Sequence, residues 1–273
     1  MTSAVDRQPR PGGLWYGLLV QFRVLSALFL REGESRRGKG FAFGFVAAAL
    51  EPLIIIIAIS TLFYLLDRQA GYGASLLVFV GTGVFPVYVF IHTSMRIREP
   101  LAGTEVGRFP VETSLDHVLI HAILHLISTV TVAFLFFGVV FYVFHDRQAI
   151  PCDWVNVIGA IGANFMLGVS MGIFNSVIAK LVPFWNTVWP GISRAAIHFS
   201  GMYFVADFLP PVHRKFFAIN PILHGVSWFR TGFYPTYPRI LDNHNFIIMT
   251  SAITMTLGLL LERQFRRVMG EAD

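Results

Sequence analysis

The chain has 273 residues, of which 55% are hydrophobic and only 14% are charged, and its formal net charge is +5. This composition excludes an ordinary soluble domain and is typical of a protein that crosses a membrane several times. The net positive charge does not require a nucleic-acid partner, because the Lys and Arg residues concentrate on one side of the predicted membrane spans. The single cysteine, Cys152, excludes an internal disulfide framework.

Residues 1–40 are predicted to form a cytoplasmic N-terminus. Within them, Leu14–Leu30 repeats its apolar residues every three to four positions but contains Gln21 and Arg23. This pattern predicts an amphipathic helix lying in the membrane interface. No short apolar core followed by a small-residue cleavage site is present, so we expect no cleavable signal peptide.

Residues 41–273 are predicted to form an all-α transmembrane domain. A span needs about 20 apolar residues, and six windows meet this need, the last one short: Phe41–Leu66, Ser75–Met95, Val118–Phe144, Trp154–Lys180, Trp185–Val205 and Phe246–Leu261. Between the last two windows, Asn220–Tyr237 is polar, rich in aromatic residues and interrupted by prolines. This segment predicts short outer or re-entrant helices at a membrane boundary.

The distribution of basic residues predicts the topology. The N-terminus, the loop after the second span, the end of the fourth span and the segment after the sixth span together hold fourteen Lys and Arg residues, whereas the opposite loops hold six. The positive-inside rule therefore predicts that both termini lie in the cytoplasm.

Two local motifs suggest enzymatic chemistry, and both have simpler interpretations. Gly33–Gly40 approaches a phosphate-binding loop, but Gly40 stands where Ser or Thr would hold magnesium, which favours a basic juxtamembrane loop. Ser170 lies in a Gly-x-Ser-x-Gly pattern, and His198 is a candidate base for an intramembrane serine hydrolase. Because small residues are common where membrane helices pack closely, helix packing is the favoured interpretation.

Polar residues inside the predicted spans are further candidates. His117, His121 and His125 recur every four residues, which puts them on one helical face; a metal or proton-relay role and a polar strip toward neighbouring helices are both open. Arg194 either faces a water-filled path or, if the fifth span begins after Trp189-Pro190-Gly191, extends to the headgroups.

The C-terminal third resembles a known family. Its pattern is Asn220-Pro221, His224, Trp228, Arg230, Pro235 and Tyr237. This is similar to the signature of the inner-membrane permease subunits of ABC exporters that move capsular polysaccharide. Further resemblance lies in Phe29–Glu32, Leu50–Leu53, Thr82–Pro86 and Arg194 with Phe199–Gly201. Ser227 departs from the family, which usually carries Glu there, so that carboxylate's role is not assigned to Ser227.

The resemblance implies a homodimeric, six-span permease of the type-2 ABC exporter family. ATP and magnesium would be bound by a separate cytoplasmic ATPase, so no cofactor, metal or catalytic residue is expected in this chain. The substrate would be a lipid-linked, often acidic capsule polymer, handed to a periplasm-spanning partner and an outer-membrane channel. The predicted ATPase-docking residues are Arg31, Glu32, Glu99, Glu105 and Arg108.

We expect the substrate path to contain Arg194, Trp228, Arg230, Tyr234 and Tyr237. Aromatic rings stack on sugars, and guanidinium groups suit anionic groups, so the last four predict an exit gate; an interfacial aromatic belt is the simpler alternative. The same architecture would also serve O-antigen, a teichoic-acid-like polymer or a lipooligosaccharide.

Overall fold

The computed structural model describes residues 39–102 and 114–269. Within these ranges the fold is all-helical, with eight α-helices and two short 3-10 turns. The elements are α2 (Lys39–Leu65), α3 (Leu76–Ala102), α4 (Ser114–Phe144), η1 (Arg147–Ala149), α5 (Trp154–Leu181), α6 (Trp185–His198), η2 (Ala206–Phe208), α7 (Pro211–Phe217), α8 (Pro221–Phe233) and α9 (His244–Met269).

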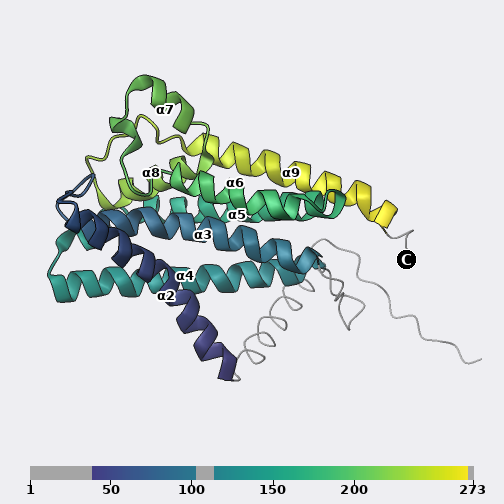
Figure 1. Cartoon of the computed structure of the whole chain (residues 1–273), viewed down its shortest axis with the longest axis horizontal. Coiled ribbons are helices and arrows are strands. Elements are labelled where there is room, and N and C mark those ends of the chain that lie inside the picture. The colour runs from purple at the N-terminus through teal and green to yellow at the C-terminus, as the bar shows by residue number, and fades with distance from the viewer. Residues whose placement is uncertain (1–38, 103–113, 270–273) are drawn as a thin grey trace, which may run out of the picture.

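Four of these helices are long and apolar enough to cross a bilayer, by length and composition, over Leu76–Met95, Ala122–Phe144, Trp154–Leu181 and His244–Gln264. They lie side by side, with α4 running in the opposite direction to α3, α5 and α9, and α2 crosses them at an angle (Figure 1). The connections 66–75, 145–153 and 199–243 gather at one end of the bundle, which we call the loop end. The predicted second, third, fourth and sixth spans are therefore confirmed as helices of spanning length, and the sixth extends beyond the predicted window Phe246–Leu261.

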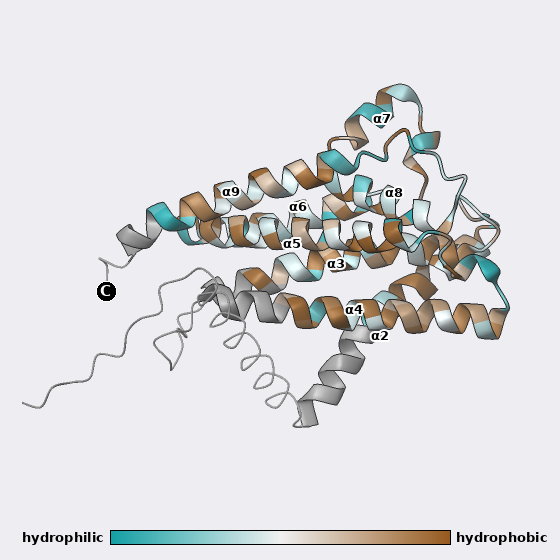
Figure 2. Cartoon of the chain, turned by 180° about the vertical axis from the view of Figure 1, so that it is seen from behind, coloured by the Kyte–Doolittle hydropathy of each residue, from teal (hydrophilic) through white to brown (hydrophobic). Residues whose placement is uncertain are grey.

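Helix α3 is the centre of the bundle. In its apolar window 78% of the residues are buried, against 22% in the windows of α4 and α9. Every residue from Val78 to Phe90 is buried, whereas α4 keeps an apolar outer face that includes Phe134 and Tyr142 (Figure 2). Such a face suits contact with lipid, because the backbone N–H and C=O groups of a helix form their hydrogen bonds within the helix.

Close packing of α3 on α5 explains the Gly-x-Ser-x-Gly pattern. A Cβ atom on Gly168 would lie 2.8 Å from the Phe90 carbonyl oxygen, and one on Gly172 would lie 2.7 Å from Ile97. The Ser170 hydroxyl donates to the Leu167 carbonyl oxygen of its own helix at 2.9 Å. These contacts agree with the packing interpretation of the motif.

The predicted fifth span, Trp185–Val205, was too long. Helix α6 begins at Trp185, continues through Pro190 without a break, and ends at His198. Gly201 then takes a left-handed conformation, with φ of +74°, which a glycine adopts without strain. The chain turns before residue 205 because the carbonyl groups of residues 201, 202 and 204 bind a side chain from another helix, α8.

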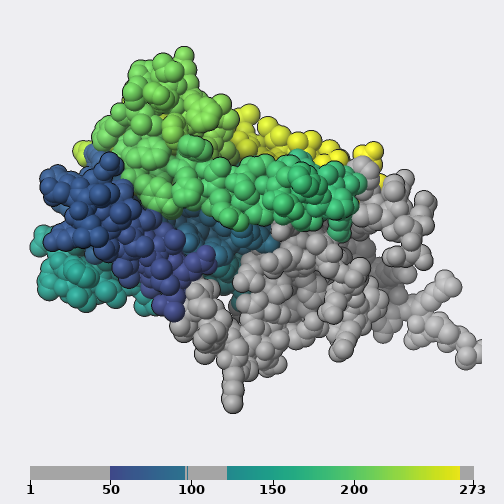
Figure 3. Space-filling model, viewed as in Figure 1, coloured from purple at the N-terminus to yellow at the C-terminus, as the bar shows by residue number. Residues whose placement is uncertain are grey.

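The short helices predicted after the fifth window are present. Asn220 caps α8 by accepting a hydrogen bond from the Ile222 amide, and Pro221 occupies its first turn, both ordinary helix-start features. Helix α8 lies against α3, α5 and α9 and is buried from Ile222 onward except at Trp228. Helix α7 stands out from the loop end (Figure 3).

Candidate functional site

Arg230 lies at the centre of a buried junction at the loop end. Only 1% of its surface is exposed. One guanidinium nitrogen, Nη1, donates to the carbonyl oxygens of Gly201 at 2.8 Å and Phe204 at 3.1 Å. The other, Nη2, donates to the carbonyl oxygens of Met202 at 2.9 Å and Phe79 at 3.4 Å. Residues 201, 202 and 204 lie outside the helices, and the Arg230 side chain supplies hydrogen bonds to their carbonyl oxygens.

The junction stabilises a charge without a carboxylate partner among the described residues. The guanidinium carbon lies 4.1 Å from the centre of the Phe79 ring, and Nη1 lies 3.3 Å from the Tyr237 hydroxyl. An aromatic face and carbonyl dipoles both favour a cation. Because Arg carries five donors in a planar fork, it can bond several carbonyl groups at once.

Three motifs that are far apart in the sequence meet in this junction. Thr82–Pro86 supplies Gly83, where a Cβ atom would overlap the Met202 carbonyl oxygen and lie 2.8 Å from Arg230 Nη2. Phe199–Gly201 supplies the turn whose carbonyl oxygen Arg230 binds. The C-terminal signature supplies Arg230 itself and Tyr237. We refer to Phe79, Gly83, Gly201, Met202, Phe204, Arg230 and Tyr237 together as the Arg230 junction.

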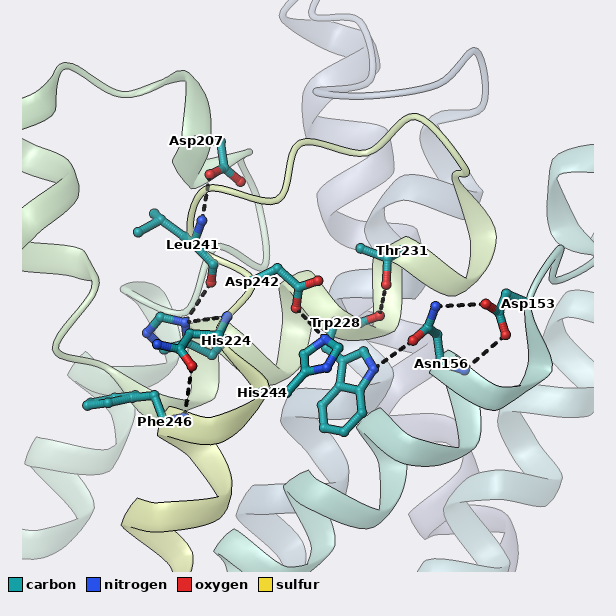
Figure 4. A network of polar contacts seen from close by, with 11 residues as sticks. Asp153, Asn156, Asp207, His224, Trp228, Thr231, Leu241, Asp242, His244 and Phe246 are labelled. Atoms are coloured by element: carbon teal, nitrogen blue, oxygen red, sulfur yellow. Dashed lines mark hydrogen bonds and ion pairs between the residues drawn. The ribbon is translucent and has the colours of Figure 1, made fainter.

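A second polar network joins the starts of α5 and α9 to α8 (Figure 4). Asp153 caps α5 and accepts a hydrogen bond from the Asn156 side chain at 2.8 Å. Asn156 in turn accepts one from the Trp228 indole at 3.0 Å. The Trp228 ring stacks on His244 with ring centres 3.8 Å apart, and His244 Nε2 lies 2.9 Å from Asp242 Oδ1.

His224 links the segments on both sides of α8. Its Nδ1 lies 2.6 Å from the Leu241 carbonyl oxygen, and its Nε2 lies 2.8 Å from the Ala218 carbonyl oxygen. The Asn243 amide is a longer contact, 3.3 Å from Nδ1. The ring therefore joins the backbone before α8 to the backbone after it.

Asp207 completes this part of the loop end. Its Oδ1 accepts a hydrogen bond from the Leu241 amide at 2.9 Å. Burial raises the pKa of the Asp207 carboxyl above its ordinary value of 3.8, although the Leu241 amide and the charge of Arg214 lower it. Burial also raises the pKa of Asp242, against the effect of His244. Both carboxyls take up protons more readily in the folded chain than in the unfolded one.

Asp207→Asn is expected to make the folded chain more stable at neutral pH. A carboxyl whose pKa is raised by folding contributes stability below its unfolded value of 3.8 and loses it as the pH rises through the folded value. Asparagine keeps an oxygen for the Leu241 amide but removes the buried charge. The difference in unfolding temperature between variant and wild type should therefore grow from pH 4 upward.

The control for this prediction is Asp67→Asn, because Asp67 is exposed. The difference in unfolding temperature between Asp67→Asn and the wild type should be the same at pH 4 and at pH 7. If the difference for Asp207→Asn is also the same at both pH values, the prediction is wrong.

The structure places the predicted path residues in two environments. Arg194 is exposed on α6, and Trp228 is half-buried. Arg230, Tyr234 and Tyr237 are buried, with exposed fractions of 1%, 4% and 3%. The three buried residues therefore do not form an open aromatic surface in this conformation, and the network of Figure 4 uses Trp228 for contacts within the chain.

Several sequence predictions fall outside the described side chains. Arg31, Glu32, Glu105 and Arg108 lie outside the described residues, as does the predicted interfacial helix, and the Glu99 side chain is not described. The side chains of His117 and His121 are not described either. His125 is described: its Nε2 lies 3.2 Å from the Thr129 hydroxyl, and its ring packs 4.7 Å from that of His92.

The hydrolase alternative gains no support from the described side chains. Ser170 is bonded to its own helix, and the His198 ring stacks on Tyr203 at 5.8 Å. Sequence reasoning did not single out Phe79, Asn156, Asp207, Asp242 or His244. Asp242 and His244 stand directly before the last apolar window, a place where helix-capping and boundary residues gather, and this signal was available.

Comparison with known proteins identifies the family. Residues 23–234 match the family described as ABC-2 type transporter. The chain belongs to the ABC-2 type transporter family. All of the Arg230 junction except Tyr237 lies within the residues of this ABC-2 chain that match, so the junction belongs to the part shared with the family.

The ABC-2 chain is also similar to curated proteins over nearly its whole length. It is 21% identical to the capsule polysaccharide export inner-membrane protein CtrC of Neisseria meningitidis serogroup B over 254 residues, which cover 93% of this chain and 95% of CtrC. It is 26% identical to the polysialic acid transport protein KpsM of Escherichia coli, with 90% and 95% covered. It is 22% identical to the capsule polysaccharide export inner-membrane protein BexB of Haemophilus influenzae, with 92% and 94% covered.

Proposed function

We propose that this chain is the transmembrane permease subunit of an ATP-driven exporter that moves lipid-linked capsular polysaccharide across the bacterial inner membrane. One observation carries the proposal. Relatives named for capsule polysaccharide export or polysialic acid transport align with at least 90% of this chain and at least 94% of their own length. The similarity therefore spans the whole transmembrane domain, not a single motif.

The finer architecture is part of the same proposal. We infer six spans, with α2 and α6 adding two passes to the four long helices, because both lie in the alternating order of the bundle (Figure 1). The sequence pattern supports cytoplasmic termini, because the predicted cytoplasmic segments hold fourteen Lys and Arg residues and the opposite loops hold six. The loop end would then face outward.

A homodimer with a separate ATPase completes the assembly. The ATPase would bind ATP and magnesium and would dock on the cytoplasmic side, where Arg31, Glu32, Glu99, Glu105 and Arg108 remain the predicted contacts. A periplasm-spanning partner and an outer-membrane channel would receive the polymer. These partners follow from the family relationship and from the resemblance of the motifs.

For the substrate path, Arg194 is the side chain that the geometry supports best. It is exposed on α6, and a charge on a membrane helix normally faces a water-filled path or a polar partner. Trp228 has a partly exposed ring. Arg230, Tyr234 and Tyr237 would act by holding α8 and the 199–205 turn in place, because they are buried in this conformation.

Arg194→Ala is expected to lower the amount of surface polysaccharide about tenfold, which corresponds to the loss of one charge-assisted contact to an anionic group. Arg194→Lys should recover part of it, because the charge remains without the planar fork. The measurement is surface polysaccharide in a strain whose own copy of the gene is deleted and replaced by each variant, with co-purification of the ATPase as a test of assembly.

Arg68→Ala is the matched control, since Arg68 is an exposed arginine in the connection 66–75, and it should export normally. If the deletion strain still displays its polysaccharide, the proposed function is wrong. If the deletion abolishes export but Arg194→Ala does not, only the assignment of Arg194 to the path is wrong.

A further inference from the structure

An apolar groove lies between α4 and α5 at the loop end. Its volume is about 260 Å³, and none of the side chains that line it is charged. Helix α4 contributes Phe134, Gly138 and Tyr142, and helix α5 contributes Trp154 and Ile161. Phe229 and Phe233 of α8, which are 2% and 3% exposed, also line it. The groove therefore reaches from the outside of the bundle to the helix that carries Arg230.

The walls of the groove are apolar enough to face the hydrocarbon of a membrane. Both walls belong to helices long and apolar enough to cross a bilayer, and the rim residues Phe134 and Trp154 are 70% and 51% exposed. Tyr142 and Trp154 have amphipathic rings, which settle at the boundary between hydrocarbon and water. In a membrane, the groove would therefore open to one leaflet near its boundary with water, where lipid acyl chains would be its neighbours.

The lining of the groove fits an acyl chain. Its side chains are uncharged, and its volume of about 260 Å³ leaves room for a string of methylene groups. A Cβ atom on Gly138 would meet no heavy atom within 4 Å, so the space beside α4 is open at this position.

We propose that this groove binds one acyl chain of a membrane phospholipid from the leaflet at the loop end. The bound chain would contact α8 directly, because the rings of Phe229 and Phe233 lie 5.3 Å apart and Phe233 packs on Phe137 of α4 at 4.7 Å. Arg230 lies between these two phenylalanines in α8. The inference requires that the chain lies in a membrane, but it does not depend on which polymer is exported.

The test uses photo-crosslinking of the full chain in bilayers that contain phosphatidylethanolamine with a diazirine in its acyl chain. In the wild type, crosslinks should concentrate in residues 130–161 and in α8. Gly138→Phe puts a ring into the open space and should lower crosslinking there about tenfold, because the ring replaces at least two methylene groups of the lipid.

Gly162→Phe is the matched control. Gly162 also lies within a spanning helix, a Cβ atom there also meets nothing within 4 Å, and it does not line the groove. This variant should crosslink as the wild type does. Gel filtration of both variants separates a filled groove from a misfolded chain, and the wild-type crosslink map tests the site even if Gly138→Phe does not fold.

Three results would overturn the proposal. One is a wild-type map without enrichment in the groove. Another is an equal loss of crosslinking in the two glycine variants. The third is a Gly138→Phe chain that keeps its lipid crosslinks but loses self-association, which would show that a side chain of a second copy occupies the groove.

Discussion

Arg230→Met is expected to destabilise the folded chain by about 3 kcal/mol, measured as the free energy of unfolding in mixed micelles of mild detergent and dodecyl sulfate. The substitution keeps most of the apolar stem but removes every donor of the guanidinium. The buried carbonyl groups of Gly201 and Met202 then lose their bonds of 2.8 and 2.9 Å. Each such orphaned group costs about 1–3 kcal/mol.

One effect opposes this loss, because removing the charge also removes its desolvation cost. We expect the orphaned carbonyls to dominate, since the guanidinium is compensated by four carbonyl oxygens and by the Phe79 ring. Arg230→Lys should recover only part of the stability, because an ammonium group cannot span carbonyls on both sides of the fork. In the exposed control, Arg68→Met, the free energy should change by less than about 0.5 kcal/mol. A loss below about 1 kcal/mol for Arg230→Met would contradict the prediction.

Gly83→Ala should destabilise the same junction, by about 2–3 kcal/mol, although it adds a single methyl group. The new Cβ atom would overlap the Met202 carbonyl oxygen and crowd Arg230 Nη2 at 2.8 Å. Neither atom can move away freely, because the two are hydrogen-bonded to each other at 2.9 Å. The unfolding assay used for Arg230 measures this effect.

Gly162→Ala is the control, since its Cβ atom meets nothing within 4 Å. It should leave stability unchanged or raise it by about 0.5–1 kcal/mol, as expected for glycine to alanine inside a helix. Equal stability of the two variants would show that the approach of the 201–204 turn to α3 is not as close as described.

Most of the long helices were predictable because their signals are local. Helix α5 begins at Trp154, as predicted, because Asp153 is a capping residue directly before an apolar run. Helix α4 ends at Phe144, where the apolar run ends. The fifth span was predicted too long because Phe199, Met202, Phe204 and Val205 continue the apolar run, and hydropathy alone cannot indicate a turn inside it.

The arrangement of the candidate site was not predictable to the same degree. The C-terminal signature predicts an exit gate or an interfacial aromatic belt, because prolines and aromatic rings are typical of a membrane boundary. It does not predict that Arg230, Tyr234 and Tyr237 are buried in this conformation. The donors and acceptors that make this burial possible come from α3 and from the turn after α6, which are remote in the sequence.

The sequence by itself determined the class of protein, the long helices, the short helices after the fifth window and the motifs that carry the family resemblance, because composition, apolar run length and helix caps act over neighbouring residues. The tertiary structure alone decided where α6 ends and which motif residues are buried. Those outcomes depend on one guanidinium reaching carbonyl groups on Phe79, Gly201, Met202 and Phe204. Such contacts exist only once the helices have packed.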